Sequence, residues 1–314
     1  METSFEHKSV LLDESIEALN IKPDGVYVDG TAGGGGHSFA IASRLTTGRL
    51  IAVDRDPDAI RAASERLVPV KDRVTLVQST YSRLSQILSE LDVSAVDGIL
   101  LDLGVSSHQF DAPERGFSYK YDAPLDMRMS KSGVSASDLV NTAPFGELAR
   151  IFREYGEERF ASRIAARIVE SRQKKPIETT FELCELIKEG IPAAARRSGP
   201  HPARRVFQAL RIEVNGELDE LSRLLDDTLS LLMPGGRLAV ITFQSLEDRM
   251  VKQRFLSLAQ GCVCPPDFPV CICGRKPQVR IPCKKGVEPS PEEIEQNPRS
   301  RSARLRFCEK IENA

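Results

Sequence analysis

The stretch Val26-Tyr-Val-Asp-Gly-Thr-Ala-Gly-Gly-Gly-Gly-His37 decides the fold of this 314-residue chain. A short apolar run ends at Asp29 and leads into four consecutive glycines, residues 33–36. Because glycine has no Cβ, the backbone can turn sharply there and approach a ligand closely. The helix expected next would present free N–H groups and the positive end of its dipole. The stretch therefore predicts a strand, a ligand-binding turn and a helix.

Strand-like and helix-like segments alternate on both sides of this stretch. The predicted strands are 26–29, 50–53, 74–77, 99–101, 238–242 and 303–308, and the predicted helices include 7–20, 38–45, 59–67, 84–91, 207–232 and 246–258. Repeated units of this size imply a parallel sheet covered on both faces. The predicted fold class is α/β, a Rossmann-like doubly wound sheet.

The alternation breaks in the middle of the chain. Residues 111–133 are polar and lack periodicity, which predicts a long ordered loop, and loops of that length are usually functional. Helical spacing follows from 136 to about 191. We therefore predict a sheet domain in two parts, 1–110 and 206–314, with an inserted helical domain for substrate recognition at 111–205.

Composition limits the partners and the compartment. Lys and Arg total 43 and Asp and Glu total 45, so nucleic acid would have to bind through local basic patches. The chain has neither a signal-peptide pattern at its start nor an apolar run approaching the ~20 residues of a membrane span. We therefore expect a soluble, cytoplasmic protein. The seven Cys are an odd count, and in a chain without an export signal we do not expect structural disulfides.

The glycine run does not fit two common phosphate-binding motifs. The dinucleotide pattern Gly-x-Gly-x-x-Gly matches at Gly33 and Gly35 but meets Ser38 at its third position. A P-loop requires Gly-Lys-Ser/Thr, whereas His37 follows the last glycine. The pattern Asp-x-x-x-Gly-x-Gly from Asp29 instead resembles class I methyltransferases, whose glycines accommodate the methionine part of S-adenosylmethionine.

Acidic residues end two further predicted strands. Asp54 follows the glycine loop by roughly 20 residues, where a carboxylate can bind the ribose of NAD or of S-adenosylmethionine. Asp102 ends the strand expected beside the glycine loop, and Tyr81 is placed to pack on an adenine. Either acid alone can simply cap a turn. Together with the glycine run, they favour a cofactor site.

Longer motifs along the chain share one resemblance. They are His7-Lys-Ser-Val-Leu-Leu-Asp-Glu14, Asp29-Gly-Thr-Ala-Gly-Gly-Gly-Gly-His-Ser38, Asp54-Arg-Asp-Pro57, Asp97-Gly-Ile-Leu-Leu-Asp-Leu-Gly-Val-Ser-Ser107, Arg115-Gly-Phe-Ser118, Pro124-Leu-Asp-Met-Arg-Met129, Tyr155-Gly-Glu-Glu-Arg-Phe160, His201-Pro-Ala-Arg204 and Phe243-Gln-Ser-Leu-Glu-Asp-Arg249. They resemble the MraW family, the bacterial ribosomal RNA small-subunit methyltransferases H, and extend over nearly the whole chain.

The resemblance implies a class I methyltransferase fold with an inserted helical domain and S-adenosylmethionine as the methyl donor. It implies methylation of the exocyclic N4 of a cytidine in the decoding region of small-subunit (16S) ribosomal RNA, either as naked RNA or in an assembled subunit. Carried over by motif, the cofactor contacts fall on Gly35, Gly36, His37, Asp54, Tyr81, Asp102 and Gln109.

The implied reaction requires in-line placement of a weakly nucleophilic amine and acceptors for its N–H groups. The catalytic candidates are Asp102 and Ser106. Asp102 can orient the donor, the amine or both, whereas Ser106 and its neighbour Ser107 can either accept an N–H or shape the turn. No covalent nucleophile is needed, so none of the cysteines requires a catalytic role.

Two arginine-rich segments supply the local charge that phosphate contacts need, although such runs are often only solvated faces. They comprise Arg196, Arg197, His201, Arg204, Arg205 and Arg211, and then Arg299, Arg301, Arg304 and Arg306. The target base must also leave its stack to react. Three aromatic residues can stack on it or pack within the inserted domain, namely Phe117, Tyr119 and Tyr121.

A cysteine-rich segment spans 262–283 and contains Cys262-x-Cys264 and Cys271-x-Cys273. Four thiolates can hold Zn²⁺ tetrahedrally, but the usual spacing is Cys-x₂₋₄-Cys. The one-residue gaps favour buried or redox-idle cysteines over a zinc site. We assign no metal ligand, and the implied reaction requires none.

Two other functions stay open at this point. An NAD-type oxidoreductase uses a similar sheet, but Ser38 replaces the third glycine and a second catalytic-domain pattern is missing. A non-catalytic ribosome-assembly protein would keep the fold only to bind RNA. The intact glycine loop, Asp54 and Asp102 argue against that loss.

Overall fold

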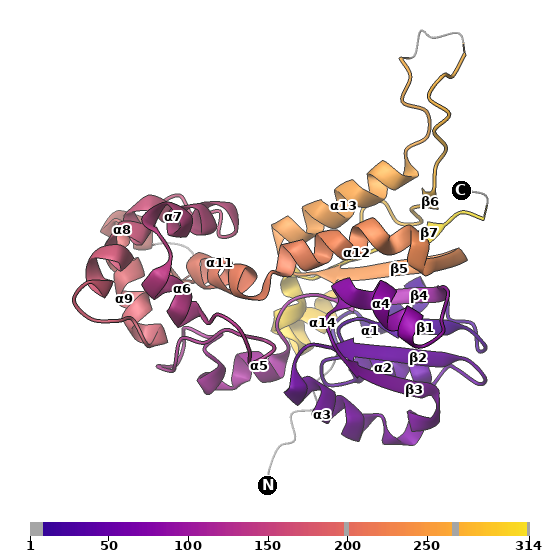
Figure 1. Ribbon diagram of the computed structural model, residues 1–314, viewed down its shortest axis with the longest axis horizontal. Coiled ribbons are helices and arrows are strands. Elements are labelled where there is room, and N and C mark those ends of the chain that lie inside the picture. The colour runs from indigo at the N-terminus through magenta and orange to yellow at the C-terminus, as the bar shows by residue number, and fades with distance from the viewer. Residues whose placement is uncertain (1–8, 198–200, 266–269, 313–314) are drawn as a thin grey trace. The chain divides into compact units, whose positions relative to one another are not determined.

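A computed structural model describes residues 9–197, 201–265 and 270–312, so His7 and Lys8 of the predicted first helix lie outside the described residues. The chain divides into two compact units (Figure 1). We call Met1–Gly104 with Asp219–Ala314 the sheet unit, and Val105–Leu218 the helical unit.

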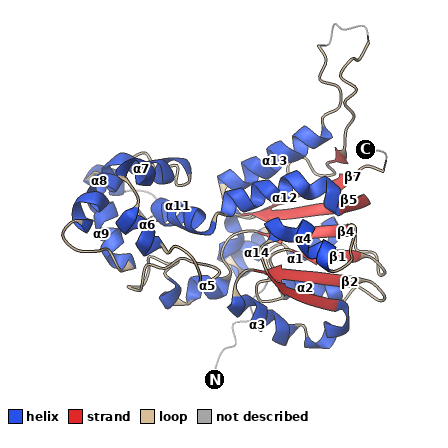
Figure 2. Ribbon diagram, in the orientation of Figure 1, coloured by secondary structure: helices blue, strands red, loops and turns tan. Residues whose placement is uncertain are grey.

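Within the described residues, the sheet unit contains one sheet of seven strands in the order β3-β2-β1-β4-β5-β7-β6 (Figure 2). The strands β1 to β5 pair in parallel, and β7 pairs antiparallel with both β5 and β6. The bounds are β1 Val26–Asp29, β2 Arg49–Asp54, β3 Val74–Gln78, β4 Val96–Asp102, β5 Leu232–Thr242, β6 Val279–Arg280 and β7 Arg304–Lys310.

The parallel strands are apolar on both faces, and alternate residues enter two different cores. On β1, Val28 packs into the core formed with helices α4, α12 and α13, whereas Tyr27 packs into the core formed with α1, α2 and α3. The predicted α/β fold, with its sheet covered on both faces, is confirmed. The bounds are α1 Leu12–Leu19, α2 Gly36–Ala42, α3 Pro57–Arg66, α4 Leu84–Glu90, α12 Glu217–Leu231, α13 Ser245–Ala259 and α14 Pro291–Gln296.

The helical unit is built around its own apolar core, which includes Phe152, Ile164 and Leu210. Its bounds of 105–218 differ from the predicted 111–205, because α11 buries Leu210 in this core rather than against the sheet. The helices are α5 Ser107–Asp111, α6 Ala136–Thr142, α7 Phe145–Glu154, α8 Ala161–Arg172, α9 Thr180–Gly190, α10 Ala193–Arg196 and α11 Arg204–Asn215. None of the helices in the described ranges is long and apolar enough to cross a membrane.

The predicted long loop at 111–133 is held in place by buried polar side chains. Arg115 donates from Nη2 to the carbonyl oxygens of Arg128 and Met129, at 3.0 and 2.9 Å. Asn215 accepts from the Met129 N–H and donates to the Met127 carbonyl, both at 2.8 Å. These bonds satisfy backbone groups that a helix or sheet would otherwise pair.

Two of the three candidate stacking aromatics pack within the helical unit. Phe117 is buried in its core. Tyr119 stacks on His201 with ring centroids 4.5 Å apart, and its edge meets Phe207. Tyr121 is 53% exposed. Packing therefore explains Phe117 and Tyr119, and only Tyr121 stays a candidate for stacking on a base.

Replacing Asn215 by Ala should destabilise the helical unit by roughly 2–4 kcal/mol, because the backbone groups of Met127 and Met129 lose their partner while staying buried. Urea unfolding measures the loss, and hydrogen exchange should show faster exchange at the Met129 amide. The control is Thr142→Ala on the exposed side of α6, which should change stability by no more than about 0.5 kcal/mol. Equal stability of the two variants would contradict this account of the loop.

Candidate active site

The turn after β1 is organised by the buried carboxyl group of Asp29. Its Oδ1 accepts the Thr31 N–H at 3.2 Å, and its Oδ2 accepts the Ser38 hydroxyl at 2.6 Å. Burial, opposed by these bonds, raises the pKa of Asp29 to about 6. Ser38 thus ties α2 back to β1, which gives the residue at the third dinucleotide-motif position a structural role.

The glycine loop leaves no room for larger residues at two positions. Gly35 has a φ of +79°, a conformation that costs other residues energy, and a Cβ there would lie 3.2 Å from the Ala63 Cα. A Cβ on Gly36 would lie 1.9 Å from the Ser9 Oγ. A larger residue would therefore be strained at Gly35 and would displace the Ser9 side chain at Gly36, while Gly34 faces open space.

Asp54, at the end of β2, holds the same loop from the other side. Its Oδ2 accepts the Gly33 N–H at 2.8 Å, and its Oδ1 accepts the Asp56 N–H at 2.9 Å. Burial raises the pKa of Asp54, and the two N–H bonds oppose that rise. A carboxylate has about four lone-pair sites, so Asp54 can anchor the loop and still accept ligand hydroxyls.

Asp102, at the end of β4, has fewer hydrogen bonds to stabilise its negative charge than Asp29 or Asp54 has. Its backbone N–H donates to Thr31 Oγ1 at 2.6 Å, but its buried Oδ1 has no hydrogen-bond partner within the described residues. Oδ2 lies 3.6 Å from Nδ1 of His37. Burial, then the charge of Asp29 and then that of Glu247, raises the pKa of Asp102 to about 8. Without a ligand, the carboxyl group of Asp102 therefore keeps its proton to a higher pH than an ordinary Asp does.

His37 and Tyr81 complete the part of the site that lies in the sheet unit. His37 is buried, and its Nε2 lies 3.1 Å from the Val10 carbonyl oxygen, which fixes the ring with Nδ1 towards Asp102. Tyr81 begins a 3₁₀ turn after β3 and lies beside the chain that leaves β1, since a Cβ on Gly30 would be 3.0 Å from the Tyr81 Cβ. The sheet unit thus gathers six of the predicted residues at one end of its strands, namely Gly35, Gly36, His37, Asp54, Tyr81 and Asp102.

Sequence reasoning missed Glu247 and Thr31. Glu247 is buried at the start of α13, where its Oε2 accepts the N–H groups of Phe243 and Gln244 and its charge acts on Asp102. The capping-box spacing of Gln244 and Glu247 was the available signal. Thr31 offered no motif, because its role depends on the pairing of β1 with β4.

Ser106 and Gln109 belong to the helical unit, where they cap α5. The Ser106 Oγ accepts the Gln109 N–H at 3.2 Å, and the Gln109 Oε1 accepts the Ser106 N–H at 3.0 Å. This reciprocal capping box satisfies two N–H groups at the start of the helix. The bonds explain why these residue types stand here, and their contacts with donor and substrate stay predictions.

The acidic end of the sheet suits a cationic ligand. Burial raises the pKa values of Asp29, Asp54 and Asp102, and nearby acids add to the rise: Asp54 for Asp29, Asp56 for Asp54, and Asp29 and Glu247 for Asp102. S-adenosylmethionine carries a sulfonium and an ammonium group, whereas NAD would bring two phosphates to this edge. The unpartnered Asp102 Oδ1 also provides a hydrogen-bond acceptor for a donor group. The residues present therefore fit the sulfonium compound better than the dinucleotide.

Comparison with known proteins gives concordant matches over nearly the full length. Residues 4–311 match the family described as the MraW methylase family. A ribosomal RNA small subunit methyltransferase H from Heliobacterium modesticaldum is 56% identical over 310 residues, covering 98% of this chain and 99% of that protein. A protein of the same name from Lachnospira eligens is 55% identical over 309 residues, covering 98% of each. A solved structure, a putative rRNA-methylase from Clostridium thermocellum, is 13% identical with a TM-score of 0.43, covering 98% of this chain and 100% of that one.

Replacing Asp102 by Asn should change the pH dependence of stability in the donor-free protein. The native pKa of about 8 exceeds the unfolded value of 3.8, so the native state binds the extra proton between these values. The wild type should lose stability as pH rises from about 4 to 8, and the variant should lack that contribution. The unfolding free energy of the variant minus that of the wild type should therefore be larger at pH 8.5 than at pH 5, by on the order of 1–3 kcal/mol. Urea unfolding at both pH values provides the measurement. With the exposed Asp72→Asn as control, parallel pH profiles for all three proteins would refute the pKa assignment.

Proposed function

The chain belongs to the MraW methylase family and is an S-adenosylmethionine-dependent methyltransferase, and we propose that it methylates the exocyclic N4 of a cytidine in the decoding region of small-subunit (16S) ribosomal RNA. The observation that carries the choice of an amine is the buried, unpartnered Oδ1 of Asp102 beside the glycine loop. The names of the relatives support the small-subunit RNA.

The chemistry asks little of the protein beyond placement and hydrogen bonding. The bound donor supplies an electrophilic methyl group on its sulfonium. Asp102 accepts an N–H of the cytosine amine through Oδ1, which raises electron density on N4 and stabilises the positive charge that develops as the N–C bond forms. A positive charge nearby lowers the pKa of Asp102, so the carboxylate needed for this role forms when the site is filled. The amine proton passes to Asp102 and then to solvent.

The remaining predicted residues take supporting roles in this proposal. Asp54 binds the ribose hydroxyls with the lone pairs that its two N–H bonds leave available. Tyr81 packs on the adenine, and Gln109 stays a further candidate contact for the donor. Ser106 is the second candidate acceptor for the amine. His37 holds Asp102 in orientation across the 3.6 Å between Nδ1 and Oδ2.

A basic hollow in the sheet unit supports an RNA substrate. It has a volume of about 490 Å³ and is lined by Lys252, Lys284, Lys285, Gly286, Glu288, Arg304 and Arg306. Arg306 is buried and pairs with Asp248 at 2.6 and 3.0 Å, so its charge is largely compensated. The three lysines are exposed and are the side chains that we propose contact the phosphates.

The arginine-rich segment of the helical unit likewise contains both an ion-paired side chain and exposed ones. Arg211 makes a two-bond ion pair with Glu217, at 2.7 and 2.8 Å, and is structural. Four others are exposed, namely Arg196, Arg197, Arg204 and Arg205. We propose that they contact the RNA backbone and that the helical unit recognises the substrate, with Tyr121 available to stack on a base. Such a substrate would place the enzyme in the cytoplasm.

The proposed function predicts N4-methylcytidine as the product. Small ribosomal subunits and naked 16S RNA, both from cells lacking the enzyme, are incubated with isotope-labelled donor. Nucleoside mass spectrometry identifies the methylated base, and oligonucleotide mapping gives its position. We expect label on one cytidine N4 in the decoding region, and comparison of the two substrates shows whether assembly is required.

Three outcomes would contradict the proposal. Label at cytosine C5 or on another base would refute the N4 assignment. RNA binding without label would favour the ribosome-assembly alternative. Calorimetric binding of NAD, with none of S-adenosylmethionine, would favour the oxidoreductase.

Replacing Asp102 by Ala should lower kcat about 10²–10³-fold at saturating donor, because the amine loses its acceptor in the transition state. The affinity for donor is measured separately by calorimetry, so that a binding defect is not mistaken for a chemical one. Asp72→Asn, an exposed acid in the same unit, serves as the control and should keep wild-type turnover. Unchanged turnover in the Asp102 variant would remove this residue from the chemical step.

A further inference from the structure

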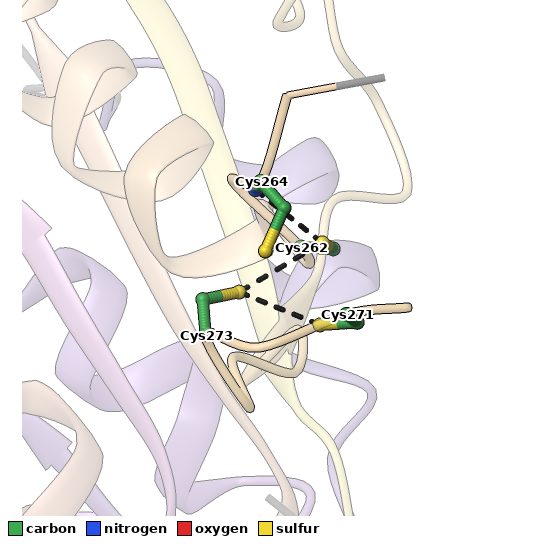
Figure 3. Close-up of side chains that lie close together, drawn as sticks. All are labelled: Cys262, Cys264, Cys271 and Cys273. Atoms are coloured by element: carbon green, nitrogen blue, oxygen red, sulfur yellow. Dashed lines mark hydrogen bonds between the residues drawn. The ribbon is translucent and has the colours of Figure 1, made fainter. Parts of the chain in front are cut away.

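The segment between α13 and β6 runs away from the sheet and returns to it (Figure 1). Its described residues bring together Cys262, Cys264, Cys271 and Cys273, whose sulfur atoms all lie within 4.8 Å of one another (Figure 3). All four are at least partly exposed, so burial in a core does not explain them. This cluster lies outside every residue that the methyl transfer uses.

We propose that these four cysteines bind one Zn²⁺ ion in a closed tetrathiolate site. A tetrahedral site with Zn–S bonds of about 2.3 Å has neighbouring sulfurs about 3.8 Å apart. The Sγ atoms of Cys271 and Cys273 are 3.6 Å apart, and those of Cys262 and Cys273 are 3.8 Å apart. A disulfide would bring two sulfurs to about 2.05 Å. These two separations therefore match edges of a metal-centred tetrahedron, and the others, all within 4.8 Å, leave the four sulfurs within reach of one ion.

The short Cys-x-Cys spacing does not prevent convergence. Each pair contributes two sulfurs from residues i and i+2, which lie on the same side of an extended chain. Gly274, with a φ of +62°, follows Cys273 and allows the chain to turn directly after the last ligand. The usual Cys-x₂₋₄-Cys spacing of zinc sites, which made zinc unfavoured from the sequence, is therefore not needed here. In this segment the two Cys-x-Cys pairs come together.

Backbone N–H groups also point at the sulfurs. The Cys264 N–H donates to the Cys262 Sγ and the Ile272 N–H donates to the Cys264 Sγ, both at 3.4 Å. Such bonds stabilise thiolates and orient them for a metal. Four thiolates and one Zn²⁺ carry a net charge of −2, and Arg275 and Lys276 follow the last ligand closely in the chain.

The segment has little else to fix its conformation. Val263, Val270 and Ile272 are 48%, 70% and 77% exposed, so these apolar side chains do not form a core in the described part of the segment. At its base, the Gln278 N–H donates to the Leu258 carbonyl at 2.8 Å, and Arg275 donates to the Ser257 carbonyl. A segment without a core needs a cross-link to be ordered, and a structural zinc ion provides one. With all four positions filled by sulfur, the ion would have no open position for substrate.

The test measures metal in the full chain. The protein is expressed without added metal, purified under reducing conditions, and its zinc content is determined by plasma mass spectrometry. We expect one zinc per chain. The double variant Cys271→Ser, Cys273→Ser should retain no more than about one tenth of the wild-type zinc content. The matched control Cys283→Ser changes a partly exposed cysteine that follows β6, outside the cluster, and should keep the full content.

A second measurement covers the case in which the double variant does not fold. Titration of the wild-type thiols with an organic mercurial should release the zinc, detected with a colorimetric metal indicator, in step with modification of the four cysteines. Circular dichroism and donor binding report the state of the sheet unit. Chelation should raise hydrogen exchange at Cys264 and Ile272 while donor binding persists.

Four outcomes would overturn the assignment. Wild-type protein that holds no zinc and takes up none when it is added would refute the site. Iron in place of zinc would refute the choice of metal. Disulfide-linked cysteines in the freshly purified protein would favour a redox pair, and full zinc content in the folded double variant would place the metal elsewhere.

Discussion

The site depends on carboxyl groups that are buried at one end of the sheet. Burying a charged carboxylate is unfavourable unless hydrogen bonds or opposite charges compensate it. Asp29 obtains that compensation from Ser38 and Thr31, and Asp54 obtains it from two backbone N–H groups of the loop segments it joins. These bonds hold the glycine loop in one conformation. Asp102 buries its Oδ1 without a hydrogen-bond partner in the described residues, and its pKa is raised furthest.

The number of hydrogen bonds to each carboxylate distinguishes the residues that shape the site from the residue that we propose acts in it. Asp29 would keep its bonds whether or not a ligand were present, because Ser38 and Thr31 belong to the fold. Asp102 is stabilised as a carboxylate only when something cationic or hydrogen-donating comes within reach. The fold thus accepts a loss of stability at Asp102, a pattern common where function requires an uncompensated group.

Much of the sheet unit was predictable because its signals are local. The strands ending at Asp29, Asp54 and Asp102 showed as apolar runs, and parallel pairing places their carboxyl ends together. The helical boundary was not predictable, since the apolar spacing of α11 does not reveal that Leu210 joins the helical core. The sequence predicted that this strand begins at Leu238, whereas β5 begins at Leu232, because the Pro and Gly residues that follow Leu232 are not typical of a strand. The capping-box spacing marks Glu247 as a helix-start residue, but its effect on Asp102 and the bond of Thr31 to the Asp102 N–H depend on packing between distant segments.

The cysteine cluster follows the same physical rule as the carboxyl groups. In both places the fold holds several acidic groups closer together than their charges favour when ionised, within 4.8 Å for the four sulfurs. Such an arrangement is stable in its ionised form only when a cation joins it. In our proposal the cation at the sheet is the sulfonium donor, which would arrive and leave with each turnover and would meet a carboxyl oxygen that has no other partner in the described residues. In the cysteine segment every ligand position would be filled by protein, so a zinc ion would stay bound. The two proposals therefore differ in one respect, since Asp102 would bind a transient ligand and the cysteines a permanent one.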